Sequence, residues 1–136
     1  GLIILTNDGE FTNLLTHPKH EVHKVYRAVI SGHLTGEDRE KLEKGVVIDN
    51  YMTAPARINL VEKSGPNSVV EISIHEGRNR QVRKMFESLG YKVLKLKRTA
   101  IGPISLGNLQ EGKWRFLSNS EVEVLRKMAV KNKQRF

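Results

Sequence analysis

The sequence predicts an α+β fold in a single domain, residues 1–136, with a mixed but mainly antiparallel sheet and flanking helices. Segments with helical and with strand-like spacing of apolar residues alternate along the chain. Two β-rich runs are joined by Ser64-Gly65-Pro66-Asn67, a strong hairpin signal, which favours antiparallel pairing over a doubly wound parallel sheet. The content of 38% hydrophobic and 28% charged residues suits one compact core.

In the first half of the chain we expect two strands and two short helices. An apolar run from Leu2 to Thr6 predicts a strand, and Asp8 in the following turn is placed to cap a short helix. Apolar and polar residues alternate from His20 to Ser31, which predicts a two-faced strand. Thr35 to Leu42 has the signals of a small polar helix that begins with a capping threonine and stops at Gly45.

The second half of the chain is expected to hold more strands, two helices and a flexible end. The predicted elements are the hairpin strands Met52 to Lys63 and Ser68 to His75, a helix from about Asn79 to Leu89, and strands Tyr91 to Ile101 and Trp114 to Leu117. Ser118 and Glu121 have the spacing of a capping box for a helix through Met128. Residues 131–136 are expected to be a flexible basic tail.

Basic charge is concentrated in one stretch of the sequence. The chain carries a net charge of +8, and the segment from Arg78 to Arg98 alone holds eight basic residues and one acid, Glu87. That stretch is therefore +7, and the other 115 residues together are +1. Because a solvated charged face usually mixes both signs, this cluster indicates a binding surface for a phosphate-rich ligand.

The spacing within this stretch predicts how the charges are displayed. Four apolar residues lie at i, i+3, i+4 and i+7 of the predicted helix, and four charged residues follow the same spacing on another face: Val82, Met85, Phe86 and Leu89 against Arg80, Arg83, Lys84 and Glu87. In the next strand we expect Leu94 and Leu96 on one side and Lys95 and Lys97 on the other, which would extend the basic surface onto the sheet. The planar guanidinium fork suits an anion site.

The same segment carries a family resemblance. The run from His75 through Glu76-Gly77-Arg78-Asn79-Arg80-Gln81-Val82-Arg83-Lys84 to Met85 resembles the E-G-R-N-R-Q-V-R-R-M motif of the RsuA/RluB-type ribosomal RNA pseudouridine synthases. Further matching motifs follow in the family's order: Leu5-Thr6-Asn7-Asp8-Gly9-Glu10, Leu15-Thr16-His17-Pro18, Lys24-Val25-Tyr26, Leu96-Lys97-Arg98 and Ile101-Gly102-Pro103. The resemblance spans residues 1 to 128.

The resemblance implies a cofactor-free isomerase that detaches uracil from its ribose, rotates it and rejoins it through carbon 5 in structured ribosomal RNA. The target base must be flipped out of its stack, and the family's tyrosine, here Tyr26, would stack on it. Arg83 matches the arginine that partners the catalytic aspartate, and Leu96 matches an apolar residue of the uracil pocket. Without the resemblance, Tyr26 and Leu96 would be ordinary core residues. The remaining basic residues would hold phosphates: Arg78, Arg80, Lys84, Lys95, Lys97 and Arg98.

The chain departs from the family's pattern at one point. In the family the catalytic aspartate lies in a G-R-L-D motif a few residues before the L-T-N-D-G stretch, and this sequence begins after that point. Asp8, Asp38 and Asp49 lack the expected neighbours, and Asp8 is better explained as a turn and helix cap. We therefore expect this polypeptide alone to lack isomerase activity and to be part of a longer enzyme.

Other kinds of site are not expected. Without cysteine there is no thiolate nucleophile or zinc–thiolate site. The spacing of His17, His20 and His23 fits neither a helical pair nor a zinc finger, so no metal is expected. There is no G-x-G-x-x-G or Walker spacing and hence no nucleotide cofactor. No apolar run reaches the roughly 20 residues of a membrane span, so we expect a cytoplasmic protein without a membrane partner. We also expect the chain to be a monomer.

Two other functions remain open from the sequence. The chain could be a non-catalytic module that binds ribosomal RNA or assists ribosome assembly, and its affinity would then depend on salt but not on Tyr26. A domain that binds an acidic protein partner is disfavoured, because the arginines crowd beside Gly77, where close approach to the backbone is easy.

Overall fold

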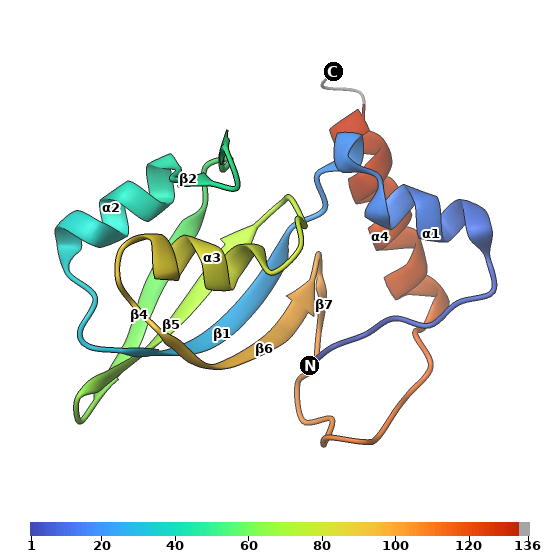
Figure 1. The fold of residues 1–136 in the computed structure, drawn as a ribbon. Helices are drawn as coiled ribbons and strands as arrows, with labels where there is room; N and C mark the ends of the chain where they lie inside the picture. The colour runs from blue at the N-terminus through green and yellow to red at the C-terminus, as the bar shows by residue number, and fades with distance from the viewer. Residues whose placement is uncertain (134–136) are drawn as a thin grey trace.

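A computed structural model describes residues 1–133 of the chain (Figure 1). The helices are α1 (Gly9–Thr16), η1 (Pro18–His20, a 3₁₀ turn), α2 (Gly36–Lys44), α3 (Gln81–Ser88) and α4 (Asn119–Lys133). The strands are β1 (Lys24–Ser31), β2 (Val47–Ile48), β3 (Tyr51–Met52), β4 (Arg57–Ser64), β5 (Asn67–Ile74), β6 (Val93–Ile101) and β7 (Ile104–Ser105). None of the helices within residues 1–133 combines the length and apolar character that crossing a membrane requires.

The main sheet has five strands in the order β4-β5-β1-β6-β7, and β2 and β3 form a separate two-stranded ribbon. All the pairings within the described part of the chain are antiparallel. The predicted hairpin is formed by β4 and β5, although its first strand begins at Arg57 rather than at the predicted Met52, and the predicted α+β class is confirmed. Helices α2 and α3 cover one face of the sheet, where Leu42, Met85 and Phe86 are fully buried in the main core.

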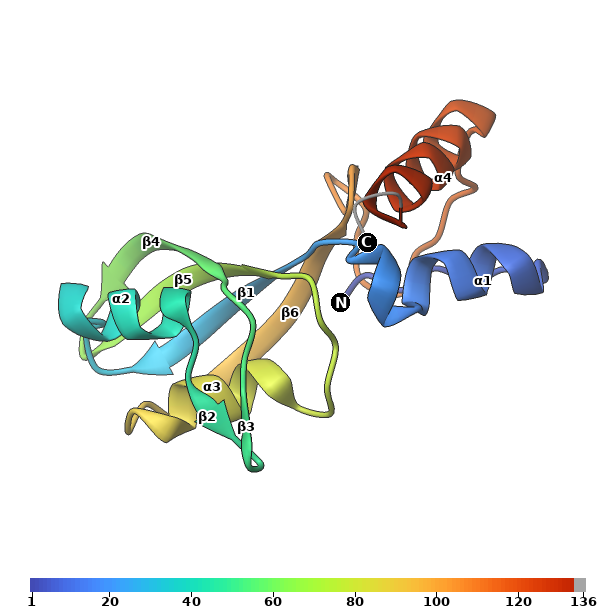
Figure 2. The same ribbon diagram turned by 90° about the horizontal axis from the view of Figure 1, so that it is seen from above.

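A second, smaller core lies at one end of the sheet. Helices α1 and α4 pack together there, beyond the start of β1 and away from α2 (Figures 1 and 2). Phe11 and Leu15 of α1 and Leu125 of α4 are buried in this cluster. Strand β6 belongs to both cores, because Val93 lies in the main one and Ile101 in the smaller one.

The helix caps follow the sequence closely. Phe11 N donates to the Asp8 carboxylate at 3.1 Å, and Asp38 N donates to the Thr35 hydroxyl at 3.1 Å, so both predicted caps are confirmed. Helix α4 begins at the predicted capping box but continues past Met128 to Lys133. The predicted flexible tail thus overlaps the helix as far as residue 133, and its last residues, 134–136, lie outside the described part of the chain.

Two predicted strands are wrong. The segment from Leu2 to Thr6 is extended but unpaired apart from Leu2, whose amide donates to Arg98 O at 2.7 Å. Trp114 to Leu117 forms no strand either, and Trp114 and Phe116 are 74% and 82% exposed. Apolar character gave both segments a strand-like pattern, but a strand also needs a continuous row of backbone partners, which local sequence does not reveal.

The alternation expected in β6 is confirmed for Leu96, Lys95 and Lys97 but is wrong for Leu94, because the strand contains two irregularities. Val93 pairs with Ile30 and Lys95 with Val29, so Leu94 is an extra residue with no partner on β1. Leu94 is accordingly 45% exposed and does not share a face with Leu96. A second shift leaves Thr99 unmatched.

Candidate functional site

A cavity of about 780 Å³ lies where the two cores meet. Its walls come from the end of α1, from β1 and β6 of the sheet, and from α3 with the loop before it. The lining residues are Leu15, Thr16, His17, Val22, Lys24, Tyr26, Ile74, His75, Glu76, Gly77, Arg78, Arg80, Gln81, Val82, Arg83, Leu96 and Arg98. A second cavity of about 540 Å³, beneath the N-terminal segment, contains none of the predicted site residues.

The three residues predicted to act on the base line the larger cavity together. Tyr26 lies opposite Arg98, and Leu96 lies opposite Ala28, so the side chains of all four residues share the sheet face that α3 covers. Arg83 reaches the same cavity from α3. Residues separated by more than 50 positions in sequence therefore meet at one place in the fold.

Arg83 is half-buried and held in a defined direction. Its Nη1 donates to the carbonyl oxygen of Val93 at 3.1 Å, which ties α3 to the start of β6. Of the acids in residues 1–133, none forms an ion pair with it. The guanidinium keeps further N–H donors for an anionic group that enters the cavity.

The cavity is strongly cationic. Five basic residues line it, Lys24, Arg78, Arg80, Arg83 and Arg98, against the single acid Glu76. Burial, and then the nearby Arg98, lower the pKa of the Lys24 ammonium. One Arg98 donor, Nε, is engaged with Leu2 O at 2.8 Å. Such a concentration of positive charge favours a phosphate-bearing or carboxylate-bearing ligand.

The loop that carries Arg78 and Arg80 is fixed by a buried amide. Gln81 is only 3% exposed. Its Nε2 donates to Glu76 Oε1 at 2.8 Å and its Oε1 accepts from Arg78 N at 3.2 Å, while Ala54 N also donates to Glu76 Oε1 at 2.8 Å. Arg80, at φ 55°, adopts the left-handed conformation immediately before α3, which explains why the helix begins at Gln81 rather than at the predicted Asn79.

Three of the predicted phosphate-binding residues do not line the cavity. Lys84 forms an ion pair with Asp49. Lys95 and Lys97 lie opposite Val29 and Arg27, on the sheet face away from α3. The predicted continuous basic surface from helix to strand is therefore interrupted, and only Arg78, Arg80 and Arg98 of the six proposed phosphate ligands surround the pocket.

The aspartates are engaged outside the cavity. Asp8 caps α1 and pairs with Arg126 at 2.9 Å, and the hydrogen bond from Phe11 N, followed by that from Arg126, lowers its pKa. Asp38 accepts from the Tyr91 hydroxyl at 2.6 Å. In the described residues no group of three or more His, Asp or Glu is arranged to hold a metal, and the buried His20 directs its Nδ1 at Leu14 O, 2.6 Å away.

Sequence reasoning missed several residues of the pocket. Lys24 was available from the pattern, because it lies two positions before Tyr26 on a strand and must share its face. Thr16 and His17 belong to the Leu15-Thr16-His17-Pro18 motif, which by itself predicts no role for them. Glu76 and Gln81 also belong to the family motif, but the sequence does not reveal that they pair, because their hydrogen bonds depend on how the loop before α3 closes against Ala54.

The chain belongs to the RNA pseudouridylate synthase family, whose sequence profile matches residues 1–88. It is 45% identical over its whole length to the ribosomal large subunit pseudouridine synthase B of Bacillus subtilis, covering 57% of that protein. It is 36% identical to the ribosomal small subunit pseudouridine synthase A of Vibrio vulnificus, over 90% of this chain and 53% of the relative. The chain thus spans about half the length of these curated relatives.

The fold is also that of a solved relative. A crystal structure of a pseudouridylate synthase superimposes with a TM-score of 0.82 at 32% sequence identity, and the match covers 88% of this chain and 52% of the other. The family resemblance deduced from the motifs is thereby confirmed.

Proposed function

We propose that this chain forms part of an enzyme that converts a uridine of ribosomal RNA to pseudouridine, and that the larger cavity receives the flipped nucleotide. The observation that carries the proposal is that Tyr26, Arg83 and Leu96, three residues singled out by family motifs, line the same cationic cavity. The family membership of the chain supports the same reaction class.

The residues have separate tasks in this reaction. The bond between ribose C1′ and uracil N1 breaks, the base turns, and a bond from C1′ to C5 forms. C5 then loses its proton and N1 takes up a proton, so that the product is an isomer of the substrate. The Tyr26 ring and Leu96 offer the detached base a replacement for the stacking it loses on leaving the RNA. Arg78, Arg80 and Arg98 would hold the flanking phosphates and so fix the strand's position.

Arg83 would orient and keep ionised the carboxylate that acts on the nucleotide. Glu76, the acid of the pocket lining, accepts hydrogen bonds from Ala54 N and Gln81 and is poorly suited to that task. We propose that the reacting aspartate belongs to a part of the enzyme outside these 136 residues, and that the chain alone does not turn over.

Release of tritium from [5-³H]uridine in ribosomal RNA tests the proposal. We expect no release by residues 1–136 alone and release by a version extended upstream through the aspartate motif. In the extended protein, Tyr26→Ala or Arg83→Ala should abolish release while RNA affinity stays within a few-fold of the parent. Tyr91→Phe and Arg39→Ala, outside the pocket, are matched controls. Turnover by the short chain, or full activity of the two pocket variants, would contradict the proposal.

A non-catalytic RNA-binding module is the competing function, supported by the cationic lining alone. It predicts RNA affinity that falls steeply with salt and the same affinity whether residue 26 is Tyr or Ala. Tritium release from the extended protein decides between the two.

A further inference from the structure

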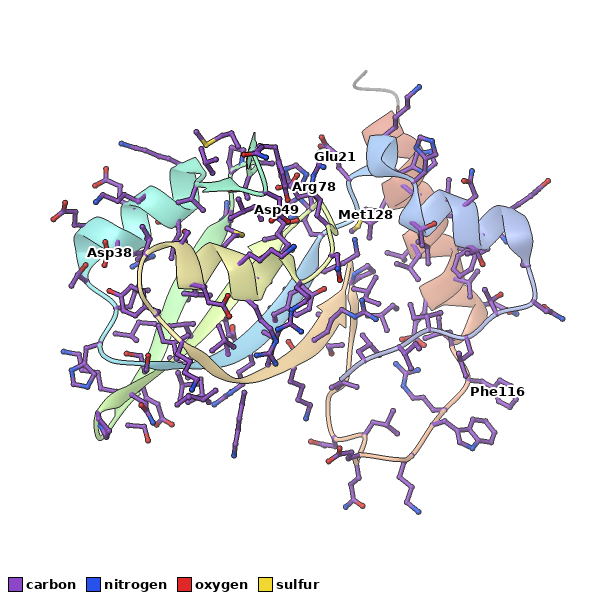
Figure 3. All side chains as sticks on the ribbon, in the orientation of Figure 1. Glu21, Asp38, Asp49, Arg78, Phe116 and Met128 are labelled. Atoms are coloured by element: carbon purple, nitrogen blue, oxygen red, sulfur yellow. The ribbon has the colours of Figure 1, made fainter. Side chains whose placement is uncertain are left out.

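A tyrosine outside the pocket contacts one of its arginines. Tyr51 lies on β3, in the small β2–β3 ribbon, and the Cζ atom of Arg78 lies 3.7 Å from the centroid of its ring. This is well inside the roughly 6 Å within which a guanidinium is attracted to an aromatic face. Figure 3 shows Arg78 beside the ribbon, near Asp49.

The Tyr51 ring, rather than its hydroxyl, makes the useful contact. The hydroxyl oxygen is buried and has no hydrogen-bond partner among the residues that the structure describes. Buried tyrosine hydroxyls normally find a partner. Burial, and then the nearby Glu76 carboxylate, raise the pKa of Tyr51, so the ring stays neutral. Phenylalanine would therefore supply everything that Arg78 meets here.

The β2–β3 ribbon is anchored to α3, so Tyr51 occupies a defined position. Ile48 is buried in the main core, and Asp49 pairs with Lys84 of α3. Asp49 and Asn50 both have positive φ, 45° and 66°, as the two central residues of a tight hairpin turn do.

The Arg78 side chain is otherwise unrestrained. Its backbone is held by Gln81, whose Oε1 accepts from Arg78 N and whose own N donates to Arg78 O at 3.1 Å. No hydrogen bond or ion pair of its guanidinium is found within residues 1–133. Stacking on Tyr51 occupies one face of the guanidinium and leaves its N–H donors, which lie in the plane, free for an anion.

We propose that Tyr51 is a positioning residue: its ring holds the Arg78 guanidinium at the mouth of the cavity, ready to contact a phosphate of the RNA strand that enters. The inference rests on the proposed function, because it takes the ligand to be RNA. Because the ring already orders the long Arg78 side chain, RNA binding does not have to pay that entropy cost. Tyr51 should therefore affect RNA affinity only through Arg78.

The test compares Tyr51→Leu with Tyr51→Phe by fluorescence anisotropy, using a fluorescein-labelled RNA stem-loop with an unpaired uridine in its loop. Tyr51→Leu should weaken binding about 2- to 5-fold, the size of an exposed cation–π contact, and Tyr51→Phe should match the parent. Arg78→Gln should weaken binding at least as much. Adding Tyr51→Leu to Arg78→Gln should cause no further loss, which a merely structural tyrosine would not satisfy.

Several results would overturn the inference. These are equal loss in Tyr51→Leu and Tyr51→Phe, additive losses in the double variant, or a lower Tm of Tyr51→Leu with unchanged RNA affinity. The Arg78 Hδ and Hε resonances give a second readout, since the ring should shift them upfield in the parent and in Tyr51→Phe but not in Tyr51→Leu. If those shifts appear but the parent protein does not bind the RNA, the proposed function has failed instead, and with it the RNA role of the contact.

Discussion

At the scale of a single residue, the buried side chain of Gln81 determines the shape of one wall of the cavity. Its amide is almost fully buried and uses both ends, Nε2 on Glu76 and Oε1 on Arg78 N. The amide therefore sets the path of the loop that brings two arginines to the cavity. A side chain of similar size without polar atoms would fill the space but leave the Glu76 carboxylate with one hydrogen bond fewer.

Gln81→Leu should lower the free energy of unfolding by about 1–3 kcal/mol, the usual cost of leaving a buried polar partner unsatisfied. Urea unfolding monitored by circular dichroism measures it. The neighbouring Asn79, an exposed amide, is the matched control, and Asn79→Leu should stay within about 0.5 kcal/mol of the parent. Equal losses in the two variants would contradict the role of the buried amide.

Individual site residues differ in how far the sequence alone predicts them. Tyr26, Arg83 and Leu96 came from motifs, and the structure brings all three to one cavity. Lys84, predicted on the same basis, pairs with Asp49, because the β2–β3 ribbon folds back onto α3. The contact between Tyr51 and Arg78 joins residues 27 positions apart, and the local sequence around either residue does not predict it.

At the scale of elements, the caps were predictable and the edge pairings were not. Each cap joins a side chain to the backbone N–H of the residue three positions later, so both partners can be read from the local sequence. This holds for Asp8, Thr35 and Ser118. Residues 2–6 or 114–117 would form a strand only if another strand lay alongside to pair with their backbone, and the local sequence does not show whether it does. The bulge at Leu94 in β6 could not be predicted for the same reason, because it is defined by the pairing of β6 with β1 and not by the sequence of β6 alone.

The start of α4 gives a measurable electrostatic signature. Glu121 accepts from the two terminal guanidinium nitrogens of Arg115, Nη1 and Nη2, at 2.8 Å and from Ser118 N at 2.9 Å. These contacts, that with Arg115 first, lower the pKa of Glu121 to about 2. Since the folded pKa lies below the ordinary value of 4.5, the stabilisation is fully present above pH 4.5 and is lost as the pH falls toward 2.

Carboxyl ¹³C NMR over that pH range measures the Glu121 pKa directly. Arg115→Gln should move the pKa upward toward its ordinary value, because the largest cause of the shift is removed. Arg126→Gln, which removes an arginine that pairs with Asp8 instead, should leave the Glu121 pKa near 2. An unchanged pKa in the Arg115 variant would rule out the ion pair as its cause.

At the scale of the whole molecule, the cavity depends on the relative position of the two cores, because residues of both form its walls. Leu15 and Val22 of the smaller core form one wall, and Val82 of the main core forms another. Strand β6 passes through both and carries Leu96 and Arg98 between them. The site is therefore a product of the assembled fold, and no single element contains it.

Replacing Phe86 measures how much the main core contributes to the stability of the fold. Phe86 is fully buried on the face of α3 that packs against the sheet, so Phe86→Ala should lower the free energy of unfolding by about 3–5 kcal/mol. Phe116, 82% exposed on the loop before α4 (Figure 3), is the matched control, and Phe116→Ala should change stability by less than about 0.5 kcal/mol. Thermal or urea unfolding compares the two, and similar losses would place the main core elsewhere.

Leu94, one of the two unmatched residues in β6, also determines where the chain tolerates a change of length. Without Leu94, Val93 and Lys95 would follow each other in an unbroken ladder with β1, and Leu96 and Arg98 would still face the cavity. Without Lys97, Arg98 would turn to the opposite side of the sheet. Among natural homologues, single-residue gaps should therefore be found at position 94 and avoided at position 97.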